Sequence, residues 1–320
     1  MRPYLPLVLT FLLPLASLAQ PFGGLGGAGP SFTLSVDPQY PAPFSTASVS
    51  VQSDTLDLAN ALMSVSVGGS KVYQGNAQPT AITLGRAGSV TRVDVVITTG
   101  GVDYTQTLSI RPQDVSLAIE PVSSAPPLYP GKPLTPIEGS VRVVAVANLR
   151  NTSGGAIDPT KLSYAWTIDD AKIATASGIG KSAVIVESPL QYRARSVSVA
   201  VTSQDGNLVG GDSLSLSPQE PLLRIYENDP LLGIRFERAL SGGYSILGAE
   251  SSLYGAPFSV PTTNGAPFLQ WFLNGAVVQT GNSITLRPTG TGRGNASLSF
   301  TASSGGSTVA SANLSLFFGL

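Results

Sequence analysis

The feature that most limits how this chain can fold is a segment that occurs three times, roughly 100 residues apart. Each copy is a strand-like apolar run with one residue at its centre that looks buried, followed at once by a turn of Gly, Asn or Asp. The copies are LMSVSVGG at residues 62–69, LSYAWTIDD at 162–170 and FLQWFLNG at 268–275, centred on Val65, Trp166 and Trp271. A repeat of this length, built from short strands, is typical of tandem β-sandwich domains.

The composition favours an all-β chain with true hydrophobic cores. Hydrophobic residues make up 42% of the 320 residues, while charged residues make up only 12%, against an average of about 25%. The 35 glycines and 25 prolines supply frequent turns and leave little room for long helices. Three sandwiches of the usual size, about 100 residues each, fill the chain. The sequence therefore predicts three antiparallel β-sandwiches in tandem.

The module boundaries follow from turn signals between alternating runs. We expect each module to close with a hairpin, which pairs residues 93–97 with 104–110, 197–201 with 213–216, and 296–300 with 312–318. Residues 227–261 are less regular, and the joints at 112–121 and 218–221 are short and contain proline, so we expect neighbouring modules to stack semi-rigidly. The predicted organisation is a signal peptide at 1–19, a Gly-rich flexible tether at 20–30, and sandwiches at 31–113, 114–218 and 219–320.

The start of the chain has the pattern of a secretory signal peptide. Arg2 gives a positive start, residues 4–15 give a leucine-rich core, and the small residues in 17–19 predict cleavage before Gln20. The alternative is an uncleaved anchor, although the apolar stretch is short for a membrane span and contains two prolines. No second hydrophobic segment follows, so we expect no membrane span in the mature chain. The sequence predicts a secreted or cell-surface protein.

The residue inventory argues against most enzyme chemistry. The chain has no histidine and no cysteine, so it lacks the commonest metal ligands besides carboxylates and the usual base for a serine or cysteine nucleophile. No G-x-S-x-G or S-x-x-K motif occurs. The formal net charge is -1 and no Lys/Arg cluster is present, which disfavours nucleic-acid binding. We expect no enzyme activity and no cofactor.

A few carboxylates are weak candidates for binding calcium. Asp169, Asp170 and Asp205 lie in predicted loops, and extracellular modules often bind this ion through loop oxygens. No interleaved D-x-D-x-D loop is present, and Asp and Asn also stabilise turns with their side chains. The interpretation favoured by the sequence is therefore that these residues shape turns.

The aromatic residues allow a second kind of site. Trp166 and Trp271 could stack on sugars, but apolar neighbours on their strands favour a structural role in the core. Tyr226, Tyr244 and Tyr254 are the stronger candidates for contacting a ligand, since they are amphipathic residues in the less regular part of the third module.

The position of the tryptophans carries a family resemblance. A Trp on the third strand followed by a polar turn resembles immunoglobulin-like and PKD-type bacterial surface domains, with residues 271–275 as the best match. The mature chain also resembles secreted immunoglobulin-like repeat proteins of small-genome bacteria, through the run RIYENDPL at 224–231. It departs from the PKD pattern, which has Gly-Asp after its Trp strand, and it lacks the antibody-type cysteine pair. The resemblance implies tandem immunoglobulin-like sandwiches and supplies no catalytic residues.

Two functions remain for such a chain. The first is an exported, non-enzymatic structural or adhesive protein that presents its modules to a protein or to the cell envelope, acting by display, spacing or strand addition at an open sheet edge. The alternative is an array of carbohydrate-binding modules that binds a glycan through aromatic side chains of the third domain. Exposed aromatic rings arranged in a line would favour the alternative.

Overall fold

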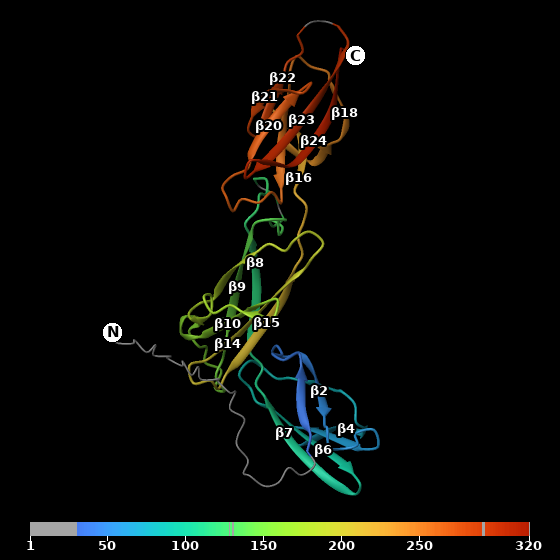
Figure 1. The fold of residues 1–320 in the computed structure, drawn as a ribbon, viewed down its shortest axis with the longest axis vertical. Helices are drawn as coiled ribbons and strands as arrows, with labels where there is room; N and C mark the ends of the chain where they lie inside the picture. The colour runs from blue at the N-terminus through green and yellow to red at the C-terminus, as the bar shows by residue number, and fades with distance from the viewer. Residues whose placement is uncertain (1–30, 128, 130, 290–291, 320) are drawn as a thin grey trace, which may run out of the picture.

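The computed structural model describes residues 31–127, 129, 131–289 and 292–319. The predicted signal peptide and Gly-rich tether lie outside the described residues. The described part consists of β-strands and turns, with one short 3-10 helix, η1 (Pro159–Lys161), and no α-helix. Three β-sandwiches follow one another along the long axis of the molecule (Figure 1). The predicted all-β fold of tandem immunoglobulin-like sandwiches is confirmed.

The first sandwich packs a three-stranded sheet, in the order β1-β2-β5, on a four-stranded sheet, in the order β4-β3-β6-β7. Because side chains alternate between the faces of a strand, Val93, Val95 and Ile97 all point into the core and are fully buried. The strands are β1 (Thr33–Asp37), β2 (Thr46–Gln52), β3 (Leu62–Val67), β4 (Ser70–Asn76), β5 (Thr80–Thr83), β6 (Thr91–Thr99) and β7 (Val102–Ile110).

The second sandwich repeats this arrangement with sheets ordered β13-β9-β8 and β11-β10-β14-β15, and the short β12 also pairs with β10. The predicted closing hairpin forms between β14 and β15, as it does between β6 and β7 in the first sandwich. The strands are β8 (Asp114–Pro121), β9 (Ser140–Asn148), β10 (Ser163–Ile168), β11 (Ala171–Lys172), β12 (Gly178–Ile179), β13 (Ala183–Glu187), β14 (Arg195–Thr202) and β15 (Val209–Leu216).

The third sandwich has two strands more than the first, and its sheets are ordered β17-β16-β19-β22 and β18-β24-β23-β20-β21. Both additions, β17 and β18, lie between the strands that correspond to β1 and β2. The predicted closing hairpin is β23–β24. The strands are β16 (Leu222–Asp229), β17 (Gly233–Leu240), β18 (Gly242–Ile246), β19 (Ser251–Phe258), β20 (Phe268–Leu273), β21 (Ala276–Thr280), β22 (Ser283–Leu286), β23 (Gly294–Ser304) and β24 (Ser307–Phe318).

Residues 227–261, which look irregular in sequence, therefore contain the whole of three strands, β17, β18 and β19. The strand pairing explains why the alternation is hard to see. The register between β16 and β17 shifts between Tyr226 and Asn228, where β17 has several extra residues and forms an irregular bulge. Strand β18 pairs in parallel with β24, so the chain passes from the sheet that contains β17 to the opposite sheet.

The three sequence repeats occupy equivalent positions in the three sandwiches. Their central residues are fully buried and each faces the middle of a neighbouring strand. The facing pairs are Val65 with Val95, Trp166 with Val199, and Trp271 with Phe300. Both indole N–H groups donate to backbone carbonyls, that of Trp166 to Lys181 at 2.9 Å and that of Trp271 to Gly281 at 3.0 Å. The repeat is thus the structural centre of each core.

The polar turn of each repeat also has a common geometry. Both residues of each turn have positive φ, as type I′ hairpin turns require; the pairs are Gly68-Gly69, Asp169-Asp170 and Asn274-Gly275. The side chains of Asp169 and Asn274 each accept a hydrogen bond of 2.9 Å, from the backbone N–H groups of Ser196 and Ser297. The residues that depart from the PKD pattern therefore hold the turn against the neighbouring strand.

In the third core, a glycine lets an aromatic ring pack directly on the backbone. The rings of Trp271 and Phe300 lie 4.3 Å apart, and Phe300 rests on the backbone of Gly255. A Cβ atom at position 255 would overlap the Phe300 ring. Gly255 thus leaves the space that the two stacked rings occupy.

Candidate functional site

The carboxylates proposed for calcium do not form one site. No three Asp or Glu side chains gather into a metal-binding group anywhere in the described ranges. Asp169 and Asp170 follow the last residue of β10, whereas Asp205 follows β14, and these strands are antiparallel. The two candidate loops therefore lie at opposite ends of one sheet. They cannot share an ion.

Each of these aspartates has a structural partner or a turn conformation. Asp169 forms an ion pair of 3.0 Å with Arg195 in addition to its bond with Ser196. Asp170 is exposed and has a φ of 64°, in the left-handed region that a short turn demands. The geometry of both residues is that of a hairpin turn.

Asp205 organises the turn between β14 and β15. Its carboxylate accepts hydrogen bonds from the Ser203 hydroxyl and from the side chain and backbone N–H of Asn207. The Ser203 hydroxyl, followed by the Asn207 groups, lowers the pKa of Asp205 to about 2. These contacts favour the charged form of the carboxylate.

We expect the turn at 203–208 to lose stability as the pH falls from about 4 to about 2. A carboxylate whose pKa is lower in the folded state stabilises the fold above its unfolded value of 3.8, and this contribution disappears on protonation. NMR titration of the Asp205 carboxyl should give a midpoint near 2, and Asn207→Ala should raise it. A midpoint at the ordinary value in the unchanged protein would contradict this geometry.

The three tyrosines proposed as ligand contacts do not form an exposed row. Tyr226 and Tyr254 are buried, only 7% and 9% exposed, and the Phe236 ring meets each of them edge-on, with centroid distances of 5.2 Å and 6.1 Å. Tyr244 is half-buried on the other sheet, and its hydroxyl lies 2.7 Å from that of Ser251. Burial raises the pKa of all three tyrosines. The rings of Tyr226 and Tyr254 are therefore not free to stack on a sugar ring, and Tyr244 is partly covered by the main core.

Tyr226 and Tyr254 instead support the β16–β17 hairpin of the third sandwich. Tyr226, Tyr254 and Ala256 form a small second core with Ile234 and Phe236. This core lies on the outer face of the sheet, because Leu223, Ile225 and Leu253 face the main core from the same strands. This second core lies beneath β17, and the described residues of the other two sandwiches form no equivalent of it.

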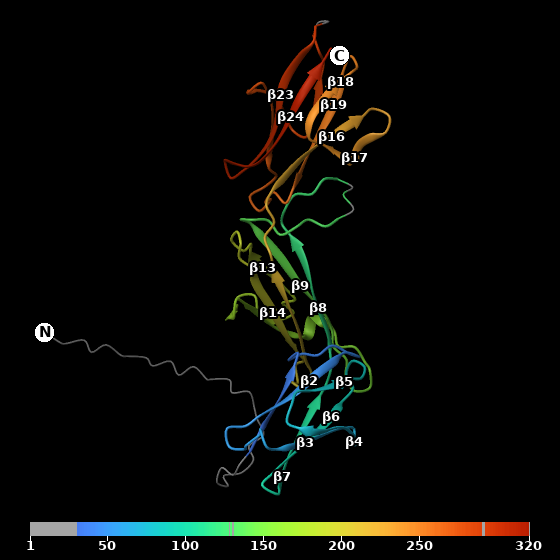
Figure 2. The same ribbon diagram turned by 90° about the vertical axis from the view of Figure 1, so that its right-hand side faces the viewer.

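The tip of this hairpin is the most exposed apolar point of the third sandwich. Leu231 is 93% exposed and Leu232 is 72% exposed. The Asp229 carboxylate accepts hydrogen bonds from both of their backbone N–H groups, at 2.8 and 2.9 Å, which fixes the turn. The β16–β17 hairpin projects from the side of the sandwich (Figure 2). The two leucines are therefore held out into solvent on an ordered support.

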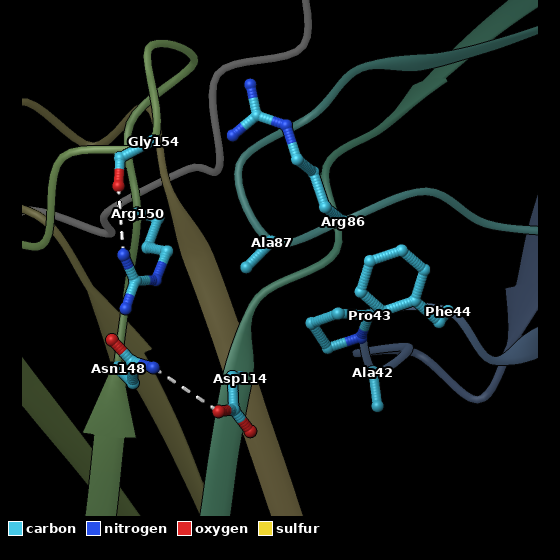
Figure 3. A pocket seen from close by; sticks show the side chains of 9 residues that line it. All are labelled: Ala42, Pro43, Phe44, Arg86, Ala87, Asp114, Asn148, Arg150 and Gly154. Carbon is cyan, nitrogen blue, oxygen red and sulfur yellow. Dashed lines mark hydrogen bonds between the residues drawn. The ribbon is translucent and has the colours of Figure 1, made fainter.

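A hollow of about 520 Å³ lies between the first and second sandwiches. Figure 3 shows Pro43 and Phe44 on one side and Asp114, Asn148 and Arg150 across the open space. Phe44 is 74% exposed and has a φ of 58°, which is rare for a bulky residue. The Arg150 guanidinium donates to the Gly154 carbonyl at 3.0 Å, and no nucleophile–base pair lines the hollow. The hollow is a feature of the joint between the first and second sandwiches.

The first joint is held by hydrogen bonds on both sides of this hollow. Arg86 donates to the Thr152 carbonyl at 3.1 Å, and the Gly88 N–H donates to the Pro112 carbonyl at 3.0 Å. The buried side chain of Gln113 both donates to the backbone carbonyl of Arg150 and accepts from its N–H. The short linker is thereby fixed to the second sandwich.

The second joint contains a pair of backbone segments from different sandwiches. Residues 122–124, which follow β8, run antiparallel to residues 259–262, which follow β19. The Ser124 N–H donates to the Val260 carbonyl at 2.8 Å, and the Ser259 N–H donates back to the Ser124 carbonyl at 3.0 Å. Tyr129, from the proline-rich segment, packs edge-on against Phe258 at 5.3 Å. The second and third sandwiches are therefore joined by a short antiparallel β-bridge between two connecting segments.

Comparison with known proteins adds little beyond the fold. No protein-family model and no curated protein matches the sequence. Among solved structures, the chain is similar to three N-terminal domains of the bacteriophage RB49 Highly Immunogenic Outer Capsid protein, at 11% identity and TM-score 0.25, covering 91% of this chain and 99% of that one. It is also similar to the central fibronectin-III array of RIM-binding protein, at 10% identity and TM-score 0.29, covering 90% and 96%. TM-scores this low support no argument about function.

The class of protein follows from the sheets themselves. The chain is an array of three immunoglobulin-like sandwiches in tandem. Among the described residues there is no helix with the length and hydropathy needed to cross a bilayer.

Proposed function

We propose that this protein is an exported, non-enzymatic spacer that holds its third sandwich at a distance and presents it to a protein of the cell surface or envelope. The observation that carries the proposal is the pair of hydrogen-bonded joints. Strand pairing between residues 122–124 and 259–262, together with the Gln113 contacts at the first joint, favours one extended body over three freely rotating modules.

The chemistry of the surface supports a protein partner. The added β16–β17 hairpin carries two exposed leucines, Leu231 and Leu232, and apolar side chains on an ordered support suit a protein interface. The aromatic residues of the third sandwich are largely taken up by its two cores. No observation therefore favours the glycan alternative. The signal-peptide pattern at residues 1–19 and the resemblance of the sequence to bacterial surface domains support export and a place at the cell surface.

Replacement of both tip leucines by serine is expected to reduce binding of the purified chain to cell-envelope fractions at least tenfold. Loss of two buried apolar anchors at an interface removes this much affinity or more. The change should leave the thermal unfolding midpoint within a few degrees, because Leu231 and Leu232 are exposed. Binding is measured by sedimentation with the fractions.

The matched control is Leu247→Ser, which removes another exposed leucine of the third sandwich, 80% exposed. It should bind like the unchanged chain. Protease treatment of the envelope fraction should abolish binding, whereas glycosidase treatment should not. Binding that survives protease and is lost with glycosidase would instead support the glycan alternative and refute the proposal.

A further inference from the structure

The last strand of each sandwich meets a different neighbour on its outer side. In the third sandwich, β18 pairs with β24 in parallel and covers it. In the second, β8 lies beside β15, and the Leu117 N–H donates to the Asp212 carboxylate at 2.8 Å. In the first, β7 pairs with β6, no other described strand pairs with it, and β1 approaches it at only a few residues. Strand β7 is thus an open edge within the described part of the chain.

The hydrogen-bonding groups of this edge can be assigned from the register. Strand β7 pairs with β6 without a shift from Thr91↔Ile110 to Thr99↔Val102. The two-residue turn Gly100-Gly101 makes Thr99 and Val102 a hydrogen-bonded pair, and such pairs alternate along the ladder. The alternate residues of β7 therefore direct their N–H and C=O groups outward: Asp103, Thr105, Thr107 and Ser109.

This edge lacks the features that normally prevent pairing with another strand. Proteins protect open edges with lysine, proline, bulges or inward-pointing charges. Strand β17 has such protection, since its register shifts and it carries Arg235, Glu237 and Arg238. Strand β7 has nine residues in regular register, with no proline, lysine or arginine and with Asp103 as its one charged residue.

The sequence of β7 matches itself when read in reverse, as pairing across a two-fold axis requires. With Gln106 on the axis, the polar and apolar positions of the two strands coincide and no like charges face each other. The facing pairs are Gln106 with Gln106, Thr105 with Thr107, Tyr104 with Leu108, Asp103 with Ser109, and Val102 with Ile110. In this register all four outward residues exchange hydrogen bonds with the second strand.

We propose that a second copy of this chain binds along β7, antiparallel and with Gln106 at the two-fold axis, so that two four-stranded sheets join into one. This inference is independent of the proposed function, because it concerns the first sandwich and not the third. A single strand pair buries less than a standard interface, so the dissociation constant is expected on the order of 10 μM.

Cysteine substitutions test both the dimer and its register, because the chain contains no cysteine. Gln106→Cys places one thiol on the axis at an exposed, non-hydrogen-bonded position, where the facing residues of the two copies come closest. Ser109→Cys is the matched control on the same strand, where the thiol would face Asp103 of the other copy. The purified chain beginning at Gln20 is oxidised mildly at about ten times the expected dissociation constant.

The expected result is a covalent dimer for Gln106→Cys and none above background for Ser109→Cys. Thr105→Pro removes one outward N–H without touching the β6 ladder, and it should shift the unmodified chain to monomer in sedimentation velocity. Three outcomes would overturn the proposal: a chain that stays monomeric at this concentration, a dimer that Thr105→Pro leaves intact, or equal cross-linking at both positions. Dimer formation only after removal of residues 20–30 would also overturn it, since the chain's own tether would then cover β7.

Discussion

Replacement of Trp166 by alanine is expected to destabilise the second sandwich by about 3–5 kcal/mol. The side chain is fully buried at the centre of its core, opposite Val199. Its removal leaves a large cavity between the two sheets, because their hydrogen-bonded strands cannot move in to fill it. The change also leaves the Lys181 carbonyl without its indole N–H donor. A loss of this size is a large part of the stability of a single domain.

Urea unfolding followed by two signals measures this effect. The chain has two tryptophans, so in Trp166→Ala the fluorescence comes from Trp271 alone and reports the third sandwich. Circular dichroism reports the strands of all three sandwiches, and in this variant it should show a transition at low urea concentration. The Trp271 fluorescence should change little across that transition. Trp166→Phe, which keeps most of the volume, should lose clearly less stability. A cost below about 1 kcal/mol for the alanine variant would show that the indole is not tightly packed.

Replacement of Gly88 by alanine is expected to open the joint between the first and second sandwiches. Gly88 has a φ of 77°, and a Cβ atom there would overlap the backbone carbonyl oxygens of Arg150 and Asn151. Backbone atoms cannot rotate away as a side chain can, so the two sandwiches must separate locally. The Arg86–Thr152 hydrogen bond, which crosses between the two sandwiches, should then be lost.

Gly101→Ala is a matched control for this substitution. Gly101 has nearly the same φ, 78°, but a Cβ atom added there would meet no other atom within 4 Å. Both variants carry the same backbone strain, of about 1–2 kcal/mol, and only Gly88→Ala carries the clash. Small-angle X-ray scattering should show a broader range of dimensions for Gly88→Ala alone. Identical scattering from the two variants would mean that the joint does not depend on this contact.

The sequence was sufficient to predict the elements that rest on local patterns. The central residues Trp166 and Trp271 and the three closing hairpins are found where the alternation and the turn residues place them. Each of these features depends on residues that are close together in the sequence, because short turns and period-two alternation are local signals.

The joints and the candidate interface could not be predicted in this way. The pairing of residues 122–124 with 259–262 joins segments 136 residues apart through backbone groups, which carry no residue-specific signal. Tyr226 and Tyr254 looked available because the bulge in β17 and the change of sheet at β18 hide the alternation around them. Two adjacent leucines in the turn at 231–232 were the available clue to the exposed tip, and only the structure places them there.

The strand pairing at the second joint has a consequence for how this protein could be rearranged in evolution. Residues 122–124 lie far from the 218–221 linker in sequence, yet they pair with the third sandwich. Exchange of the third sandwich alone for an unrelated one would leave those backbone groups and Tyr129 without partners. The second and third sandwiches are therefore inherited most easily as one unit.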